Sequence, residues 1–550
     1  AIFDFGTVHH PVLAKHGMVS AQDRIAAEVG RDILARGGNA VDAAVATGFA
    51  LAVTHPQAGN LGGGGFMLVH LAETDETIAI DFREMAPAKA DRDMYLNGSG
   101  DVDNAMAQFS RASAGVPGTV MGLLDALETY GTMSRRQVIG PAIRLAAEGF
   151  TVSPALAQSL ESAREELSAD ESSVAYFLGH NAGDNWVQTD LAKTLRRIAN
   201  KGAEGFYSGK TAMLITLEMA QGNGLITSDD LANYVTVTRE PVMGTYRGYE
   251  IAAMSPPSSG GVHIVQMLNI LEGYDLQADG HNSAAYLHKL IESMRRAYAD
   301  RSKYLGDPDF VDVPVDALTK KDYADALRDG IDLDKASLSS DILPGSKLMD
   351  EPVNTTHYSV MDKFGNAVSV TYTLNFSYGS GYSVDGAGFL LNNEMDDFSA
   401  KPGSPNGYGL IGGEFNQIEP RKRPLSSMTP MIVMKDGNVV LATGSPGGST
   451  IITAVLQVAL NVMEWDMNLA EATARGRIHH QWLPDMVATE PVISPDTLRA
   501  LDGMGHMLPK DETDGYAHTI LGRVNSVGQS GDYIAGAADP RGPKSAAVGF

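Results

Sequence analysis

The stretch NTTHYSV (residues 354–360) sets two threonines between an asparagine and an alternating run typical of a β-strand. One interpretation is structural, because Thr favours strands and Asn commonly ends a loop. The other is that the chain is cut before Thr355, which leaves a threonine whose free amine lies beside its own hydroxyl. An N-terminal amine with a pKa of ~8 can take the proton from that hydroxyl and make it a nucleophile. The stretch alone leaves both interpretations open.

The residues that follow predict a β-hairpin. A strand, a Gly-containing turn and a second strand fit HYSVMDKFGNAVSVTYTLN (residues 357–375). A three-residue loop with Gly365 in the left-handed conformation sets Thr355 opposite Thr373, whereas a two-residue turn shifts the register by one. In the first register the period-two alternation gathers polar side chains on one face of the pair. These are Thr355, His357, Ser359, Thr371, Thr373 and Asn375.

Composition and charge exclude several classes of function. The length of 550 residues allows three or four domains or one large sandwich, and 43% hydrophobic with 20% charged residues is the balance of a globular protein. A formal charge of -25, from 42 Lys plus Arg against 67 Asp plus Glu, repels phosphate backbones and anionic lipid, so nucleic acid is not expected as a partner. The absence of Cys excludes disulfides and thiolate chemistry.

The sequence predicts no membrane span. Its longest apolar run, residues 44–53, is too short to cross a bilayer. The chain begins AIFDF without an initiator Met, which fits a mature form whose export signal has been removed and fits a shortened chain equally well. Export is therefore permitted and not established.

The first 150 residues alternate helical and strand patterns. Ser20 and Asn39 are the expected N-caps of two helices within residues 21–38 and 40–53, and glycines 37 and 38 are expected to end the first.

Further along, strands and then helices are expected. Two short apolar runs, 66–71 and 77–82, predict a hairpin with Arg83 at its exit. Helical periodicity dominates residues 117–334, apart from the interruption MSPPSSGG. Residues 335–353 are rich in Ser, Asp and Pro and are expected to be an exposed connector.

Two glycine-rich stretches raise the question of phosphate binding. GNLGGGGF (residues 59–66) precedes a strand, whereas a dinucleotide-binding loop joins a strand to a helix. TGSPGGST (residues 443–450) ends a second predicted hairpin and begins a helix, so it is a tight turn capped by Ser449 or an anion-binding loop, without the Lys of a phosphate-binding loop. The adjacent histidine pairs lack partners at metal-ligand spacing and are expected to be structural or surface residues: His9, His10, His479 and His480.

A set of stretches in one order along nearly the whole chain adds a family resemblance. They are GNLGGGGFM, DFREMAPAKA, MSPPSSGG, YADRSKYLGDPDF, NTTHYSV, TYTLN, LLNNEMDDFSAKPG, KRPLSSMTP, TGSPGGS and HHQWLPD, with DPR starting at Asp539. In these stretches the chain resembles the bacterial γ-glutamyltransferases (γ-glutamyltranspeptidases), which are self-processing N-terminal nucleophile hydrolases. The resemblance implies an α+β fold, a four-layer αββα sandwich built jointly by two autoprocessed subunits. These are a large subunit of residues 1–354 and a small one of residues 355–550, separated by a cut between Asn354 and Thr355.

The resemblance also implies roles for the site residues. Thr355 is the nucleophile, Thr373 hydrogen-bonds to it, and the N–H groups of Gly447 and Gly448 form the oxyanion hole. The substrate-binding residues are Arg83, Ser426 and Ser427 for the α-carboxylate, Asn375, Glu394 and Asp397 for the α-ammonium, and Tyr408 on a covering loop, residues 399–413. Taken singly, Arg83 is also an ordinary solvated charge, the serines are turn or capping residues, and LLNNEMDDF is a solvated acidic turn.

The activity implied is cleavage of the γ-glutamyl bond of glutathione and related amides through a γ-glutamyl-threonine intermediate. The group then passes to water or to an amino acid or peptide amine, with no cofactor and no metal. The two subunits form a heterodimer, and the resemblance implies a periplasmic or secreted location. A cephalosporin or glutaryl acylase of the same superfamily is the alternative enzyme, and an unprocessed, catalytically silent γ-glutamyl- or nucleotide-binding protein is the alternative of another class.

Overall fold

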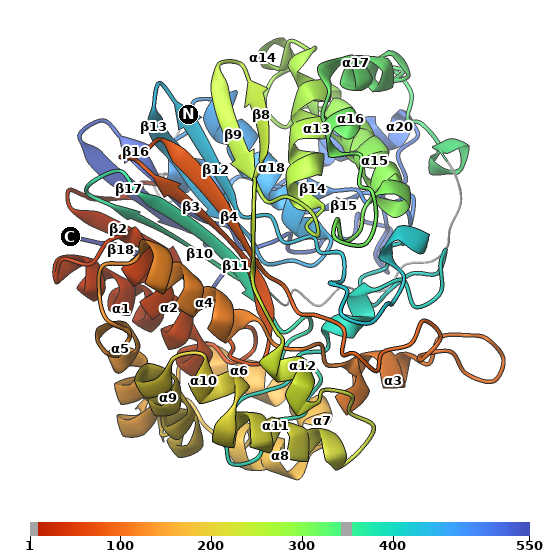
Figure 1. Cartoon of the computed structure of the whole chain (residues 1–550). Coiled ribbons are helices and arrows are strands. Elements are labelled where there is room, and N and C mark those ends of the chain that lie inside the picture. Colours follow the sequence, from red (N-terminus) through yellow and green to blue (C-terminus); the bar gives the residue numbers. More distant parts are fainter. Residues whose placement is uncertain (1–8, 343–354) are drawn as a thin grey trace.

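Two seven-stranded antiparallel sheets lie face to face, and helices cover their outer faces (Figure 1). The structure is a computed structural model that describes residues 9–342 and 355–550. Helices, sheet, sheet and helices follow one another as four layers, so the predicted αββα sandwich is confirmed.

The sheet that carries Thr355 has the strand order β18-β2-β10-β11-β3-β4-β7. Its strands are β2 (Gly17–Ala21), β3 (Gly64–Leu71), β4 (Glu76–Phe82), β7 (Val237–Arg239), β10 (Thr355–Asp362), β11 (Ala367–Thr373) and β18 (Ala546–Gly549). The facing sheet has the order β1-β17-β16-β13-β12-β9-β8. Its strands are β1 (Val12–Ala14), β8 (Val242–Tyr246), β9 (Tyr249–Ala253), β12 (Met431–Lys435), β13 (Asn438–Gly444), β16 (Asn525–Ser530) and β17 (Tyr533–Ala538). Strands from both sides of the 354/355 bond thus take part in both sheets.

Each outer face is covered by its own group of helices (Figure 1). The sheet of Thr355 is covered by α1 (Arg24–Ala35), α2 (Ala40–Thr54), α4 (Thr119–Tyr130) and, beyond them, α5 (Arg135–Glu148), and the facing sheet by α13 (Gly260–Glu272), α15 (Ala284–Tyr304) and α18 (Thr450–Met463). Other helices are α3 (Asn104–Gln108), α6 (Pro154–Ser162), α7 (Arg164–Leu167), α8 (Glu171–Phe177), α9 (Thr189–Lys201), α10 (Glu204–Tyr207), α11 (Gly209–Ala220), α12 (Ser228–Ala232), α14 (Leu276–Asp279), α16 (Val315–Leu318), α17 (Lys321–Asp329), α19 (Leu469–Ala474) and α20 (Pro495–Gly503). Among the described residues, no helix has both the length and the apolar character needed to span a bilayer.

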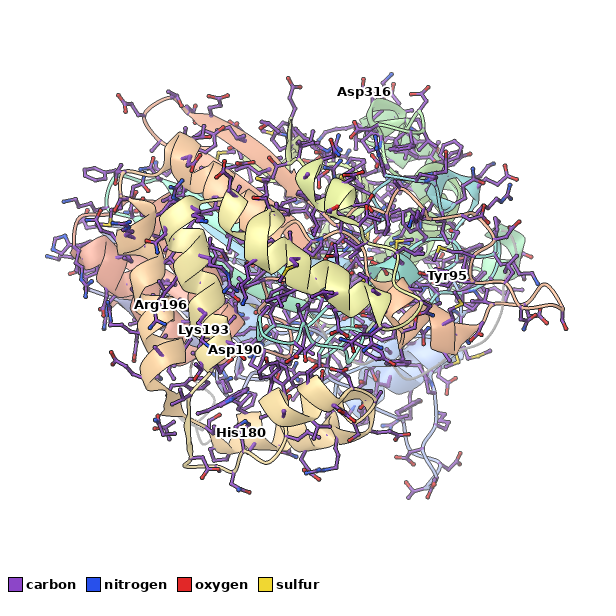
Figure 2. All side chains as sticks on the ribbon, turned by 60° about the horizontal axis from the view of Figure 1, so that its bottom comes forward. Tyr95, His180, Asp190, Lys193, Arg196 and Asp316 are labelled. Atoms are coloured by element: carbon purple, nitrogen blue, oxygen red, sulfur yellow. The ribbon has the colours of Figure 1, made fainter. Side chains whose placement is uncertain are left out.

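The outer helices follow the amphipathic pattern that the sequence predicts. In α9, Leu191, Leu195 and Ile198 are buried, whereas Lys193 and Arg196 are exposed. Figure 2 shows Lys193 and Arg196 on this helix beside Asp190, whose carboxylate accepts a 2.8 Å hydrogen bond from the Lys193 ammonium. Such an exposed pair adds little stability, so the helix is held mainly by its apolar face.

The first two helices test the capping predictions. Asn39 caps α2 as expected, and it forms a capping box with Asp42. The prediction for Ser20 is wrong, because Asp23 caps α1 through hydrogen bonds from the N–H groups of residues 25 and 26. Ser20 lies inside β2, and its hydroxyl donates to the Ala537 carbonyl of the facing sheet at 2.7 Å.

The expectation of helical structure through residues 117–334 is wrong for residues 237–253, which form β7, β8 and β9. β8 and β7 are edge strands of the two sheets, and both are only partly buried. Their sequences therefore lack the regular apolar alternation of a core strand. Part of the predicted connector, residues 343–353, lies outside the described residues.

The hairpin β10–β11 has the register predicted for a three-residue loop. Thr355 lies opposite Thr373, and Gly365 has a φ of 88°. The polar face of the hairpin points toward the other sheet, where the Ser369 hydroxyl donates to the Thr443 carbonyl at 2.9 Å. The opposite face carries valines that pack in one apolar cluster with α2. Thr355 therefore lies between the two sheets, and Thr356 on the helix side.

Candidate active site

One narrow cavity of about 20 Å³ brings together ten of the eleven residues assigned to substrate chemistry. It is lined by Arg83, Thr355, Thr373, Asn375, Glu394, Asp397, Tyr408, Ser426, Ser427 and Gly448, together with Leu410, Met428 and Ile451. Gly447 is adjacent in sequence but does not line it. Asn354, on the other side of the predicted cut, lies outside the described residues.

The two threonines meet at the base of this cavity. Their hydroxyl oxygens are 3.3 Å apart, and both side chains are buried. The Thr373 hydroxyl also accepts a 2.9 Å hydrogen bond from the N–H of Asn375. Because Thr373 is fixed on the neighbouring strand and by this bond, it holds the Thr355 hydroxyl in one orientation.

The glycine turn after β13 reaches the same cavity. Gly447 and Gly448 have φ values of 142° and 54°, which residues with a side chain rarely adopt. A Cβ on Gly448 would lie 2.6 Å from the Tyr408 ring, so only glycine fits beneath that ring. The turn leads into α18, which puts backbone N–H groups and a helix N-terminus near Thr355.

Arg83 lies at the centre of a buried charge cluster. One of its terminal nitrogens contacts Glu394 and lies 3.6 Å from Glu84, and the other donates to Asp397 at 2.5 Å. Its Nε donates to the Pro424 carbonyl at 3.2 Å, which fixes the plane of the guanidinium. A guanidinium and carboxylates side by side complement the carboxylate and the ammonium of an α-amino acid.

Burial and charge set the protonation of this cluster in opposite directions. Burial lowers the pKa of Arg83, but the charges of Glu394, Asp397 and Glu84 outweigh burial, so the net shift is upward. Burial raises the pKa of Glu84 to about 7 against the opposing charge of Arg83. Burial likewise raises the pKa of Glu394 well above its ordinary value. At neutral pH the three carboxyl groups therefore carry fewer than three negative charges.

The serine pair faces the cavity from a segment tied to the MSPPSSGG stretch. Ser258 forms a backbone bridge with Ser426, whose N–H donates to the Pro257 carbonyl at 2.8 Å. The Ser427 hydroxyl accepts a 3.2 Å hydrogen bond from the buried Arg301. The Ser426 hydroxyl accepts a 3.1 Å hydrogen bond from the N–H of Met428, and both serines line the cavity together with Arg83.

Tyr408 covers the cavity and belongs to the loop of residues 399–413. Its hydroxyl donates to the Asn375 carbonyl at 2.7 Å, and its side chain is buried. The loop is tied down beside it, because the N–H of Gly407 donates to Asp396 at 2.9 Å. Gln108 donates to the other oxygen of the same carboxylate at 3.0 Å.

Several residues at the site had no assigned role from the sequence, although each lies in a quoted stretch. Glu84 follows Arg83, Arg301 lies in YADRSKYLGDPDF, Asp396 precedes Asp397, and Gln481 lies in HHQWLPD. Being next to a charged residue says nothing about which side chain turns inward. The family resemblance singles out Asp397, and the structure adds that Asp396 holds Gln108 and the covering loop.

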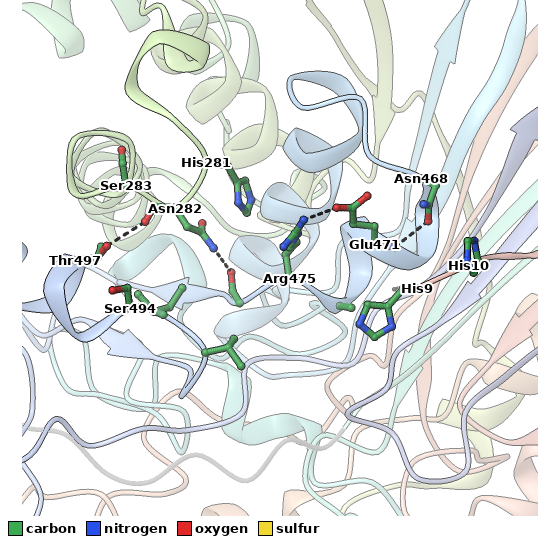
Figure 3. A pocket seen from close by; sticks show the side chains of 14 residues that line it. His9, His10, His281, Asn282, Ser283, Asn468, Glu471, Arg475, Ser494 and Thr497 are labelled. Atoms are coloured by element: carbon green, nitrogen blue, oxygen red, sulfur yellow. Dashed lines mark hydrogen bonds and ion pairs between the residues drawn. The ribbon is translucent and has the colours of Figure 1, made fainter. Parts of the chain in front are cut away.

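A larger hollow of about 800 Å³ lies elsewhere (Figure 3). His9, His10 and His281 line it together with an Arg475–Glu471 ion pair at the surface. It brings together no activated hydroxyl and no buried charge pair. Size alone would favour this hollow, but the chemistry favours the narrow cavity at Thr355.

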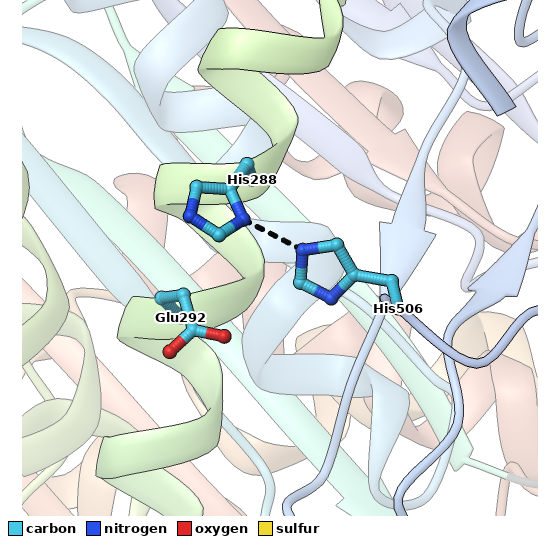
Figure 4. A group of neighbouring side chains, drawn as sticks. All are labelled: His288, Glu292 and His506. Carbon is cyan, nitrogen blue, oxygen red and sulfur yellow. Dashed lines mark hydrogen bonds between the residues drawn. The ribbon is translucent and has the colours of Figure 1, made fainter. Parts of the chain in front are cut away.

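Within the described residues, one group of buried side chains has the composition of a metal site (Figure 4). His288 and His506 share a 2.7 Å hydrogen bond between their rings. Glu292 pairs with both Arg295 and Arg296, and it accepts a 3.1 Å hydrogen bond from the N–H of residue 337. Because two cations already neutralise the carboxylate, the group is better explained as a hydrogen-bond network that joins α15 to the segments around it.

Comparisons with known proteins identify the family of the chain. The sequence model of the family described as Gamma-glutamyltranspeptidase matches residues 26–549. The chain belongs to the γ-glutamyltranspeptidase family. It is 53% identical over 548 residues to the glutathione hydrolase proenzyme of Escherichia coli (strain K12), covering 99% of this chain and 93% of that protein.

Two solved structures illustrate the range of the fold. A chain of Helicobacter pylori γ-glutamyltranspeptidase is 47% identical, with a TM-score of 0.58, and the match covers 64% of this chain and 100% of that one. A cephalosporin acylase from Bacillus halodurans is 26% identical, with a TM-score of 0.85, and the match covers 100% of this chain and 98% of that one. The fold of this γ-glutamyltranspeptidase family member is therefore shared with acylases, and its chemistry has to be argued from the site.

The Asp396 carboxyl group should give the folded protein a pH-dependent stability. Burial raises its pKa to about 7, whereas an unfolded Asp titrates near ~4. The folded state holds this proton more tightly, so the contribution to stability is full below pH ~4 and is lost as the pH rises toward 7. Asp396→Asn is neutral throughout, so its Tm relative to wild type should rise between pH 4 and pH 7, measured by scanning calorimetry. Asp312→Asn, at an exposed position, should show no such trend. A pH-independent difference between Asp396→Asn and wild type would contradict the buried, neutral carboxyl.

Proposed function

We propose that this protein is a self-processing γ-glutamyltransferase that cleaves the γ-glutamyl bond of glutathione and related amides. The group passes to water or to the amine of an amino acid or peptide. The observation that carries the proposal is the pairing of Arg83 with Asp397 and Glu394 in the same cavity as the Thr355–Thr373 hydroxyl pair. The charged residues complement the α-carboxylate and α-ammonium of a γ-glutamyl group. The threonine pair is suited to attack on its γ-carbonyl. The family membership supports the same activity.

In the proposed reaction the Thr355 oxygen attacks the γ-carbonyl carbon, and the α-amine of Thr355 takes the hydroxyl proton. The N–H groups of Gly447 and Gly448 stabilise the oxyanion. The C–N bond breaks, the leaving amine receives the proton, and a γ-glutamyl ester remains on Thr355. Water or an acceptor amine then attacks this ester and restores the hydroxyl.

The same hydroxyl is proposed to create its own free amine. The Thr355 oxygen attacks the carbonyl carbon of Asn354, the Asn354–Thr355 C–N bond breaks, and the Thr355 nitrogen receives the hydroxyl proton. Water then hydrolyses the ester, which gives a large subunit of residues 1–354 and a small subunit of residues 355–550. The two stay associated as a heterodimer because both contribute strands to each sheet. The H. pylori match supports this division, since residues 1–354 are 354/550, or 64%, of the chain, the same share that the match covers.

The proposed partners are small molecules: γ-glutamyl donors such as glutathione and glutamine-like amides, and amino-acid or peptide acceptors. A buried Arg83 flanked by acidic groups favours a zwitterionic head group over a simple anion or cation. A periplasmic or secreted location is proposed on the family resemblance alone.

Thr355→Ala should remain a single chain, because no hydroxyl is present to attack the Asn354 carbonyl. Thr356 lies on the helix side of its strand, so Thr356→Ala should still yield two fragments. Denaturing electrophoresis with N-terminal sequencing of the smaller fragment is the measurement. Two fragments from Thr355→Ala would remove Thr355 from the mechanism.

Asp397→Asn distinguishes this activity from that of an acylase acting on glutaryl groups. A glutaryl group keeps the carboxylate but lacks the ammonium, so loss of the Asp397 charge should reduce turnover of γ-glutamyl substrates alone. The expected loss is about 2 to 3 kcal/mol, or about thirty- to a hundredfold in kcat/KM for a γ-glutamyl anilide, with little change for the glutaryl anilide.

The alternative outcome has its own physical meaning. If Asp397 acts only by orienting Arg83, which it contacts, both anilides should lose activity equally, because both carry the carboxylate. Equal losses would therefore end the assignment of Asp397 to the ammonium.

A further inference from the structure

Gln481 lies beneath the covering loop, in the HHQWLPD stretch, and it takes no part in the proposed chemistry. The side chain is buried, and both ends of its amide are used. Its Oε1 accepts hydrogen bonds from the Ser449 hydroxyl at 2.5 Å and from the His479 ring at 2.9 Å. Its Nε2 donates to the Tyr408 carbonyl at 3.3 Å.

The orientation of this amide follows from its neighbours. The Tyr408 carbonyl only accepts, so the NH₂ of Gln481 must face it and the oxygen must face His479. His479 therefore carries its proton on Nε2, and its Nδ1 accepts from the Thr453 hydroxyl at 2.8 Å. Burial lowers the pKa of His479 to about 4, in keeping with a neutral ring. The three partners fix Gln481 in a single arrangement.

The two residues that Gln481 joins belong to different parts of the site. Tyr408 is the covering residue, and Ser449 directly follows Gly447 and Gly448 at the start of α18. Tyr408 also packs on Gly448, where a Cβ would lie 2.6 Å from its ring. The loop and the glycine turn thus touch at the Tyr408 ring, and one amide joins the Tyr408 carbonyl to the Ser449 hydroxyl.

We propose that Gln481 is a positioning residue that couples the loop of residues 399–413 to the glycine turn of residues 447–449. The closed position of Tyr408 and the placement of the turn's N–H groups then depend on each other. This inference rests on the proposed function, because it assigns the glycine turn a part in the reaction. The coupling predicts that a substitution in the glycine turn raises the mobility of the loop, and that a substitution in the loop raises the mobility of the turn.

Two variants break the bridge from opposite ends. Gln481→Glu keeps the acceptor toward Ser449 and His479 but sets a carboxylate oxygen against the Tyr408 carbonyl. Ser449→Ala removes the hydroxyl of the turn and leaves every loop residue unchanged. Gln188→Glu is the matched control, because the Gln188 amide also donates to a backbone carbonyl, that of Val53 at 2.8 Å, outside the network of Gln481.

The first measurement is the rate at which chymotrypsin cuts after Tyr408, under limiting protease, where cleavage follows the population of the open loop. Gln481→Glu and Ser449→Ala should each raise this rate by about fivefold to tenfold, the effect of one lost hydrogen bond. The control should cut at the wild-type rate. An unchanged rate in Ser449→Ala, or an equal rise in the control, would overturn the coupling.

The second measurement separates positioning from general destabilisation. For a γ-glutamyl anilide, both variants should lower kcat by more than they change KM. The double variant should lose no more than the worse single variant, because both remove the same bridge. Fully additive losses would contradict the proposal. If the wild-type chain neither matures nor turns over the anilide, the proposed function fails, whereas the chymotrypsin rates still test the coupling.

Discussion

The register of the hairpin β10–β11 is the constraint on which the site depends. Side chains of a strand alternate between faces, so a shift of one residue would turn Thr355 toward α2 and bring Thr356 between the sheets. Gly365 and the three-residue loop fix this register at one end. At the other end, Thr373 lies within reach of the Thr355 hydroxyl.

The second requirement is a charged pocket at the right distance from that hydroxyl. Strand β4 ends at Phe82, and the chain then buries Arg83 against carboxylates from the segment after β11. A buried cation with several buried acids is costly unless each charge is compensated, so such a cluster is rarely kept for stability alone. Its composition matches the two opposite charges of an α-amino acid head group, and this match gives the cluster its function in our account.

Local sequence patterns predicted those features of the fold that arise locally. The Asn39 cap and the first β-hairpin follow from cap and turn rules, and the Thr355–Thr373 register is one of the two that the turn rules allowed. Ser20 and β7 were mispredicted, because their state is decided by pairing with distant strands and leaves little local signal. Strands β8 and β9 form a local hairpin around Arg247 and Gly248, and this turn signal was missed.

In the site, too, local features were predicted from the sequence and long-range contacts were not. The threonine pair is predicted from the hairpin, but Arg83 and Asp397 are 314 residues apart, and only a family resemblance could connect them before their contact was seen. The assigned roles did not predict their direct ion pair, because Arg83 was assigned to the substrate α-carboxylate and Asp397 to the α-ammonium. Gln481 had no assigned role at all, because a buried amide is recognised by its partners and not by its neighbours in sequence.

The proposed function requires that Thr355, whose amine becomes free at the start of the small subunit, attacks through its hydroxyl. The most direct test is to label the wild-type protein with an electrophilic diazoketone analogue of glutamine, digest it with trypsin and locate the adduct by mass spectrometry. We expect one adduct, on Thr355 of the peptide that spans residues 355–363 and begins with a free amine. An adduct on Ser426, Ser427 or Thr373, or a labelled Thr355 still joined to Asn354, would contradict it.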